Sequence, residues 1–278
     1  GDFVTHLAGE PEVDVVACYV EGFRPGDGLR FLEGARAVAA RGGTVVLYHA
    51  GRTGEGARAA AFHTAAVAGD HAVAGALASR SGVVVADSLE DFEDLVMLAT
   101  LLRNRRVEGP GLGAVSNAGF ECVAMADGAT GFRLAPFADA TESALAGILA
   151  AAGVDGIVGV SNPLDLTPMA DDAAFADAVL AVLADPSVDV GVVGCVPMTP
   201  ALGMLAGQIE DPRSLVVRLG EVWARTDSAW VVVVDGGPIY DAAAAELLRR
   251  GIPVFRRADR ALRSLAAYCS SRLGRHGA

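Results

Sequence analysis

The chain contains no lysine: all 22 of its basic residues are arginine, against 34 aspartate and glutamate residues. This absence excludes any mechanism that uses a lysine amine, Schiff-base chemistry included. The net charge of −12 argues against nucleic-acid binding through a basic face, because neutralising phosphates needs clustered positive charge. No uninterrupted apolar run reaches the roughly 18 residues that span a bilayer, so we expect no membrane association.

Cysteines are few and scattered. Cys18, Cys122, Cys195 and Cys269 include no Cys-x-x-Cys pair, so we expect free thiols rather than a metal site or a disulfide. Free thiols are typical of a reducing compartment. The opening residues 1–3 are acidic, and the apolar segment of a secretory leader does not follow them. We therefore predict a cytoplasmic location.

Valine-rich runs alternate along the chain with alanine- and leucine-rich segments of helical periodicity, which is the pattern of parallel α/β folds. The pattern begins with a strand over residues 13–20 and restarts after Gly153. We predict an α/β fold of two flavodoxin-like parallel-sheet domains, residues 1–152 and residues 153–278, each of ordinary domain size. The junction lacks a Ser/Gly-rich spacer, so we expect the two domains to be packed together.

One histidine, His63, lies in an otherwise small-residue stretch from Ala59 to Gly69. Small residues allow close approach of a ligand, and a neutral imidazole is a nucleophile. Composition alone favours a loop or core histidine satisfied by hydrogen bonds. However, Gly-Arg-Thr ending at Thr53, followed by Arg-Ala-Ala-Ala-Phe-His-Thr-Ala-Ala-Val-Ala-Gly-Asp, resembles the phosphohistidine segment of NDP-forming (ADP-forming) acyl-CoA synthetases, which are relatives of succinyl-CoA synthetase.

The resemblance covers nearly the whole chain, from Val15 to Tyr268, and implies the two central ligase-type domains of that superfamily. It implies that His63 carries phosphate on an exposed loop at the boundary between the two domains. Glu21, in a Tyr-x-Glu-Gly pattern at the end of a strand, would orient His63 and balance its charge, directly or through a water. Taken without the resemblance, Glu21 is a solvated loop acid.

A phosphate-binding set is also implied. Asn117, Ala118 and Gly119 follow a predicted strand and open a helix, whose N-terminal N–H groups and dipole suit an anion. Thr64 and Arg52 join this set, and the guanidinium of Arg52 offers a bidentate fork to phosphate. An ordinary strand-to-helix turn and a structural ion pair are the alternative interpretations.

A second-domain loop carries further candidates. Asn162 and Asp165 lie in a segment similar to the Asn-Pro-x-Asp-Leu motif that opens the second ligase-type domain, although a simple turn explains them too. His49 stands where relatives often carry lysine, and His71 is expected to be a surface residue. We predict no metal ligands in this chain.

The function implied by the resemblance is that of a ligase module, relaying phosphate through His63 between acyl phosphate and ADP. No tightly bound cofactor is expected, whereas CoA, ATP or ADP, and Mg belong to the complete enzyme. The CoA-binding and ATP-grasp domains of the family are absent from this chain. We expect them as partner domains or subunits, and we expect no complete activity without them. Homo-oligomerisation is left open.

Three departures keep an alternative open: Phe62, Ala65 and Phe120 stand where relatives favour serine, glycine and glycine. They would suit a catalytically lapsed module that acts as an acyl-CoA sensor or scaffold in a larger protein. A flavodoxin-type electron carrier is disfavoured, because the chain lacks a Ser/Thr-rich phosphate loop and only 6% of its residues are aromatic.

Overall fold

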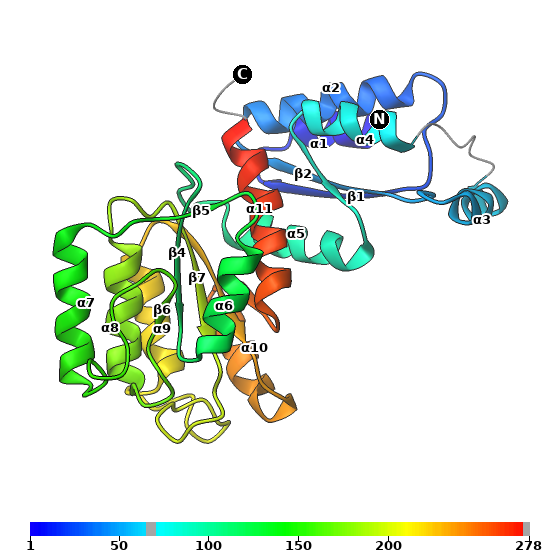
Figure 1. The fold of residues 1–278 in the computed structure, drawn as a ribbon. Coiled ribbons are helices and arrows are strands. Elements are labelled where there is room, and N and C mark those ends of the chain that lie inside the picture. Colours follow the sequence, from blue (N-terminus) through cyan, green and yellow to red (C-terminus); the bar gives the residue numbers. More distant parts are fainter. Residues whose placement is uncertain (65–70, 275–278) are drawn as a thin grey trace. The chain divides into compact units, whose positions relative to one another are not determined.

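The chain divides into two units, each built on its own parallel sheet (Figure 1). The computed structural model describes residues 1–64 and 71–274, with side chains for residues 1–60 and 71–274. The first unit comprises Gly1–Arg103 with Ala267–Ala278, and the second comprises Asn104–Ala266. None of the helices in the described part of the chain combines the length and the apolarity that crossing a bilayer requires.

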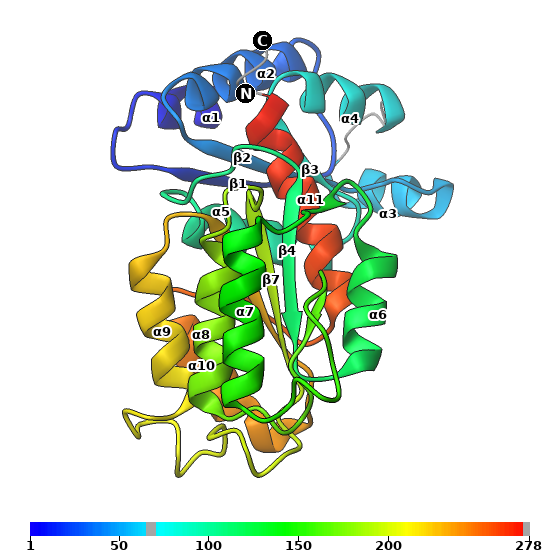
Figure 2. The ribbon, with the colours of Figure 1, turned by 60° about the vertical axis from the view of Figure 1, so that its left-hand side comes forward.

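The first unit holds a three-stranded parallel sheet in the order β1-β2-β3. Helices α1, α2 and α4 cover one face of this sheet, and α5 lies on the other face (Figures 1 and 2). The elements in chain order are α1 (Asp2–Ala8), β1 (Val15–Val20), α2 (Asp27–Ala40), β2 (Thr44–His49), α3 (Gly54–Thr64), α4 (His71–Arg80), β3 (Val83–Ala86) and α5 (Leu89–Leu101).

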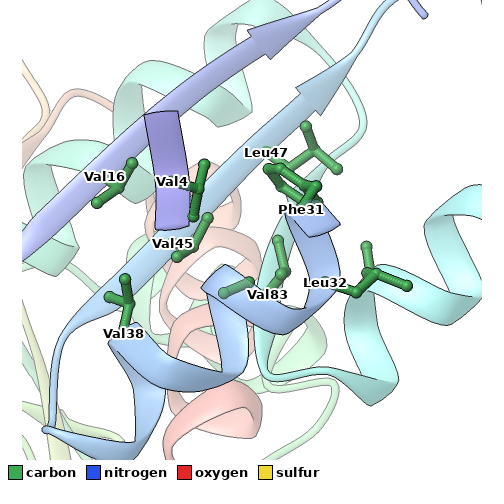
Figure 3. Packing of buried hydrophobic residues seen from close by; sticks show 10 residues of the cluster. Val4, Val16, Phe31, Leu32, Val38, Val45, Leu47 and Val83 are labelled. Carbon is green, nitrogen blue, oxygen red and sulfur yellow. The ribbon is translucent and has the colours of Figure 1, made fainter. Parts of the chain in front are cut away.

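Aliphatic side chains from the sheet and from the covering helices form the core of the first unit (Figure 3). Val45 and Leu47 of β2 are about 1% exposed and contact Phe31 and neighbouring residues of α2. Helix α1 packs closely on α2 at Gly34, where a Cβ would lie 2.8 Å from the backbone nitrogen of Thr5. Only glycine therefore allows this helix contact.

The second unit holds a six-stranded parallel sheet in the order β5-β4-β7-β8-β9, with β6 also paired to β4. Helices α7, α8 and α9 lie on one face and α6 on the other (Figures 1 and 2). The elements are β4 (Gly111–Ser116), α6 (Gly119–Gly128), β5 (Arg133–Leu134), α7 (Asp139–Ala151), β6 (Leu164–Asp165), α8 (Asp172–Leu183), β7 (Val190–Cys195), α9 (Leu215–Arg225), β8 (Ala229–Val234), η1 (Pro238–Tyr240), α10 (Asp241–Arg249) and β9 (Val254–Phe255). The last helix, α11 (Ala258–Gly274), begins in the second unit, and its residues from Ala267 on belong to the first.

The division between the units differs from the predicted boundary between residues 152 and 153. Strand β4 pairs with β7, with Val115 opposite Val193, so the two strands belong to one sheet. Both strands are buried along their whole length, as expected for the central strands of a parallel sheet. The boundary therefore lies near residue 103, whereas the α/β class and the two parallel sheets are confirmed.

Candidate functional site

Glu21 directly follows β1, at the carboxyl edge of the first sheet. Its Oε1 accepts a hydrogen bond from the hydroxyl of Tyr19 at 3.3 Å. Its Oε2 is buried and has no hydrogen-bond partner among the described residues. A buried carboxylate oxygen without a donor is costly, so Glu21 has unused capacity to accept a hydrogen bond.

A pocket of about 460 Å³ lies at the carboxyl end of the neighbouring strand, β2. We call it the β2-end pocket; it is lined by residues 51–54 with Ala57, His71 and Ala72. Thr53 Oγ1 accepts from the backbone N–H of Gly56 at 3.1 Å, which marks the beginning of α3. The pocket therefore combines a helix N-terminus with the guanidinium of Arg52, two features that suit an anion.

Two histidines stack beside this pocket. The rings of His49 and His71 lie 4.9 Å apart, centroid to centroid, with 3° between their planes. His71 Nε2 lies 2.9 Å from the carbonyl oxygen of His49. Burial, and then the nearby His71, lower the pKa of His49 below its ordinary value, which favours the neutral imidazole. His71 is half-buried in the pocket wall, which corrects the expectation of a surface residue.

The segment that carries His63 is helical, which corrects the predicted loop. Helix α3 runs through Gly54–Thr64 and so includes the backbone of His63 and Thr64. The alanines at positions 59–61 have the highest helix propensity of any residue, which accounts for the difference. The side chains of His63 and Thr64 lie outside the described residues, so their predicted roles and the predicted contact with Glu21 remain predictions.

In the second unit, the predicted phosphate turn lies at the carboxyl end of β4. The side chain of Asn117 is buried and exchanges two hydrogen bonds with the backbone of Val196, at 2.8 and 2.9 Å. This amide therefore ties the ends of β4 and β7 together and is not available to a ligand. Helix α6 has Ala118 as its N-cap residue, without a side-chain cap.

The backbone N–H groups of Gly119 and Phe120 have no acceptor among the described residues. Phe120 is 61% exposed, so its ring lies in solvent and does not fill the core. Asp165 lies beside this turn, because a Cβ at Gly119 would be 3.0 Å from Asp165 Oδ2. The helix terminus can thus offer N–H groups to an anion, but a carboxylate stands close to it.

Asn162, the other residue predicted for the second-domain loop, lies within the sheet structure. Its side-chain amide bonds to the N–H of Ala114 at 3.0 Å and to the carbonyl oxygens of Leu112 and Ala135 at 2.7 and 2.9 Å. These contacts join β4 to the segment after β5. The side-chain amide of Asn162 therefore bonds to backbone groups of the fold.

The sequence places Glu121 in the first turn of a helix, α6, where an inward-pointing acid would repel phosphate, but it did not predict that this carboxyl group is buried. Glu121 is 1% exposed, and its Oε2 accepts from the hydroxyl of Ser116 at 2.6 Å, while Oε1 has no partner among the described residues. A Cβ at Gly194 would lie 2.0 Å from Oε2, so the carboxyl group packs directly on β7. Burial raises the pKa of Glu121 to about 7, with a further contribution from Asp235.

This buried carboxyl should make stability depend on pH. Because the pKa of folded Glu121 exceeds its ordinary value of 4.5, the folded chain binds more protons than the unfolded chain between these values. The contribution of Glu121 to the free energy of unfolding is fully present below pH 4.5. It is lost as the pH rises to 7, at up to about 1.4 kcal/mol per pH unit. Urea unfolding should therefore show Glu121→Gln gaining stability relative to wild type between pH 5 and pH 8.

The matched control is Glu142→Gln on α7. Glu142 is exposed, so this variant should show the same pH dependence of stability as the wild type. Equal pH dependence of the wild type and the Glu121→Gln variant would contradict the assignment of a buried carboxyl with a raised pKa.

Comparison with known proteins supports the class of protein that the sequence resemblance implied, the ADP-forming acyl-CoA synthetases. The profile of the succinyl-CoA ligase like flavodoxin domain matches residues 1–99, which is nearly the whole of the first unit before α11. A trans-feruloyl-CoA synthase from an unknown prokaryotic organism is 29% identical over 269 residues, covering 95% of this chain and 36% of that protein. The alpha subunit of an ADP-forming acetate–CoA ligase II from Pyrococcus furiosus is 28% identical, covering 93% of this chain and 53% of the subunit.

A solved structure matches both units. The dinucleotide-forming acetyl-coenzyme A synthetase 1 of Ca. Korarchaeum cryptofilum, in complex with phosphate and ADP, is 27% identical and superposes with a TM-score of 0.82. The match covers 99% of this chain and 56% of that chain. The present chain thus spans about a third to about half of the length of the relatives named here.

The first unit is a flavodoxin-like domain of the succinyl-CoA ligase type. The chain belongs to the ADP-forming acyl-CoA synthetase family and corresponds to part of a member of that family. No group of three or more histidine, cysteine, aspartate or glutamate side chains is placed to hold a metal ion in the part of the chain that the structure describes.

Proposed function

We propose that this chain is the phosphate-relay module of an ADP-forming acyl-CoA ligase, with His63 as the phosphate carrier. Acyl-CoA and phosphate give acyl phosphate and CoA. A ring nitrogen of neutral His63 then attacks the phosphorus; the P–N bond forms as the P–O bond to the acyl group breaks, and the carboxylate leaves with the electron pair. A terminal oxygen of ADP finally takes the phosphoryl group, which returns His63 to its neutral form.

The β2-end pocket is the observation that carries this proposal. It lies at the beginning of α3, and His63 lies nine residues further along the same helix, about 14 Å away along the axis, so phosphate has to move between the pocket and the carrier. Arg52 and the N-terminal N–H groups of α3 would bind phosphate there, before or after its transfer. Thr64 would add a hydroxyl next to the carrier. The Korarchaeum relative was solved in complex with phosphate and ADP, and phosphate is the ligand proposed for the β2-end pocket.

Glu21 is proposed as the residue that orients His63. Its Oε2, buried and without a donor among the described residues, can accept the N–H of an imidazole. Such a bond fixes the tautomer and leaves the other ring nitrogen free to attack. In the second unit, the N–H groups of Gly119 and Phe120 are proposed to bind phosphate, as the N-terminus of a helix can.

The sensor or scaffold alternative is favoured by one specific feature. Asp165 and the buried Glu121 place two carboxyl groups around the first turn of α6, where the relay requires an anion to bind. Negative charge at this position opposes phosphate, although a Glu121 with a pKa of about 7 is partly neutral. In this alternative the chain binds acyl-CoA with its partner domains but transfers no phosphate.

The experiment for the pocket is a titration of the chain with inorganic phosphate. Arg52→Gln should weaken phosphate binding about tenfold, because a charge-assisted hydrogen bond is lost. The control is Arg58→Gln, also near the start of α3, whose guanidinium pairs with Glu55 at 2.9 Å on the surface. Binding that responds equally to both substitutions, or not at all, would exclude the β2-end pocket as the phosphate site.

A further inference from the structure

A second cavity of the first unit lies between α2, β2 and α4, and its walls are apolar. It has a volume of about 330 Å³. Its lining includes Leu47 of β2, Phe31 and Leu32 of α2, and Leu77 of α4. Its volume falls in the range of roughly 300–1,000 Å³ that is typical of small-molecule sites.

The mouth of this cavity exposes apolar surface to solvent. Leu29 at the beginning of α2 is 68% exposed and Leu77 is 48% exposed, although both line the cavity. Leaving two leucines in water is unfavourable in proportion to the apolar area that could be covered. An apolar occupant of the cavity would recover part of that free energy.

One charged side chain lines the cavity, that of Arg24. It lies in the turn before α2 and is exposed. The hydrogen bond from Arg30 is the main cause of the lowered pKa of Asp27, and the charge of the Arg24 guanidinium contributes to it, although no salt bridge joins Arg24 to Asp27. Asp27, the carboxylate near it in sequence, already pairs with Arg30 at 2.5 Å. The N-cap residue of α2, Gly26, also lines the cavity and provides no side-chain cap, so the positive end of the helix dipole faces the same turn.

We propose that this cavity binds the anion of an apolar carboxylic acid, of the size of an eight-carbon chain or a substituted aromatic ring. The hydrocarbon part would fill the space between Phe31, Leu47 and Leu77. The carboxylate would accept the hydrogen bonds of Arg24 at the mouth, where a bidentate pair is geometrically suited. The site does not depend on the phosphate relay, because it contains none of the residues assigned to that relay.

The test is calorimetric titration of the full chain with octanoate. Saturable binding is expected with a dissociation constant on the order of 1 mM or tighter. Ala74→Phe, which places a ring into the cavity from α4, should weaken binding at least about tenfold. Val73→Phe, the neighbouring position on the same helix, is 53% exposed and does not line the cavity, so it should bind octanoate as the wild type does.

A second pair of variants tests the charge. Arg24→Gln should weaken octanoate binding about tenfold and leave the binding of octan-1-ol unchanged. Arg36→Gln, an exposed residue of α2 outside the cavity, should change neither. Absence of saturable octanoate binding, or equal affinity in the wild type, Ala74→Phe and Arg24→Gln, would overturn the proposal. The relay would be unaffected, and His63→Ala should still bind octanoate.

Discussion

Replacing His63 with alanine is expected to reduce acyl-CoA formation by about 10³-fold or more, when the chain acts together with the CoA-binding and ATP-grasp parts of the family. The expected loss is large because removing the nucleophile of a covalent relay removes the intermediate itself. The measurement is steady-state acyl-CoA formation with ATP, CoA and a carboxylic acid. The assembly that contains the His63→Ala chain should still bind CoA, because the site around His63 is not expected to hold CoA.

Two further variants separate the relay from a general effect on the site. Glu21→Gln should slow phosphorylation and leave the unfolding transition unchanged, because it retains a hydrogen-bonding group but removes the charge. His71→Ala removes the ring that stacks on His49 at 4.9 Å and should lower the rate far less than His63→Ala does. Normal turnover with alanine at position 63 would refute the phosphohistidine and favour the sensor or scaffold alternative.

Residues 153–278 expressed alone are expected not to fold, whereas residues 104–278 should unfold cooperatively in urea. The shorter fragment lacks β4, the strand that pairs with β5, β6 and β7. It also lacks four buried apolar side chains of the second unit, Leu112, Met125, Leu145 and Leu149. Each contributes roughly 1.5–3 kcal/mol, and together they approach the net stability of about 5–15 kcal/mol that a domain has.

Circular dichroism and urea titration of the two fragments measure this difference. The longer fragment is the control, because both share α8, β7 and every later element. A cooperative transition in residues 153–278 would contradict the assignment of β4 to the second sheet and would support the boundary predicted from the sequence.

Periodicity predicted most of the individual elements. The strand expected at residues 13–20 is β1, Val15–Val20. Such a segment has a strong local signal, because its apolar residues repeat with the period of the element. The two parallel sheets follow from the alternation of such segments.

The domain boundary did not follow from the sequence because strand pairing is not local. Strands β4 and β7 are more than 70 residues apart, and nothing in either strand identifies the other as its partner. A restart of the alternating pattern after Gly153 is compatible with a new domain and equally with the second half of one sheet. The pairing of Leu112 with Val190 decides between the two.

The candidate site was predictable only in part. Glu21 and Arg52 do follow strands at the carboxyl edge of the first sheet, as the sequence pattern indicated. The burial of Glu121 could not be predicted, because an acid in the first turn of a helix is normally a solvated residue that favours the dipole. Its carboxyl group packs against Gly194 of β7, which lies 73 positions further along the sequence.

The most direct test of the relay is to locate the phosphate. The complete assembly should be incubated with ATP labelled at the γ-phosphate, quenched in alkali to preserve phosphohistidine, and digested for mass spectrometry. The account predicts one acid-labile phosphate, on His63, which disappears in His63→Ala and discharges on addition of ADP. A complete assembly that turns over without this label, or that carries it on another residue, would contradict the account.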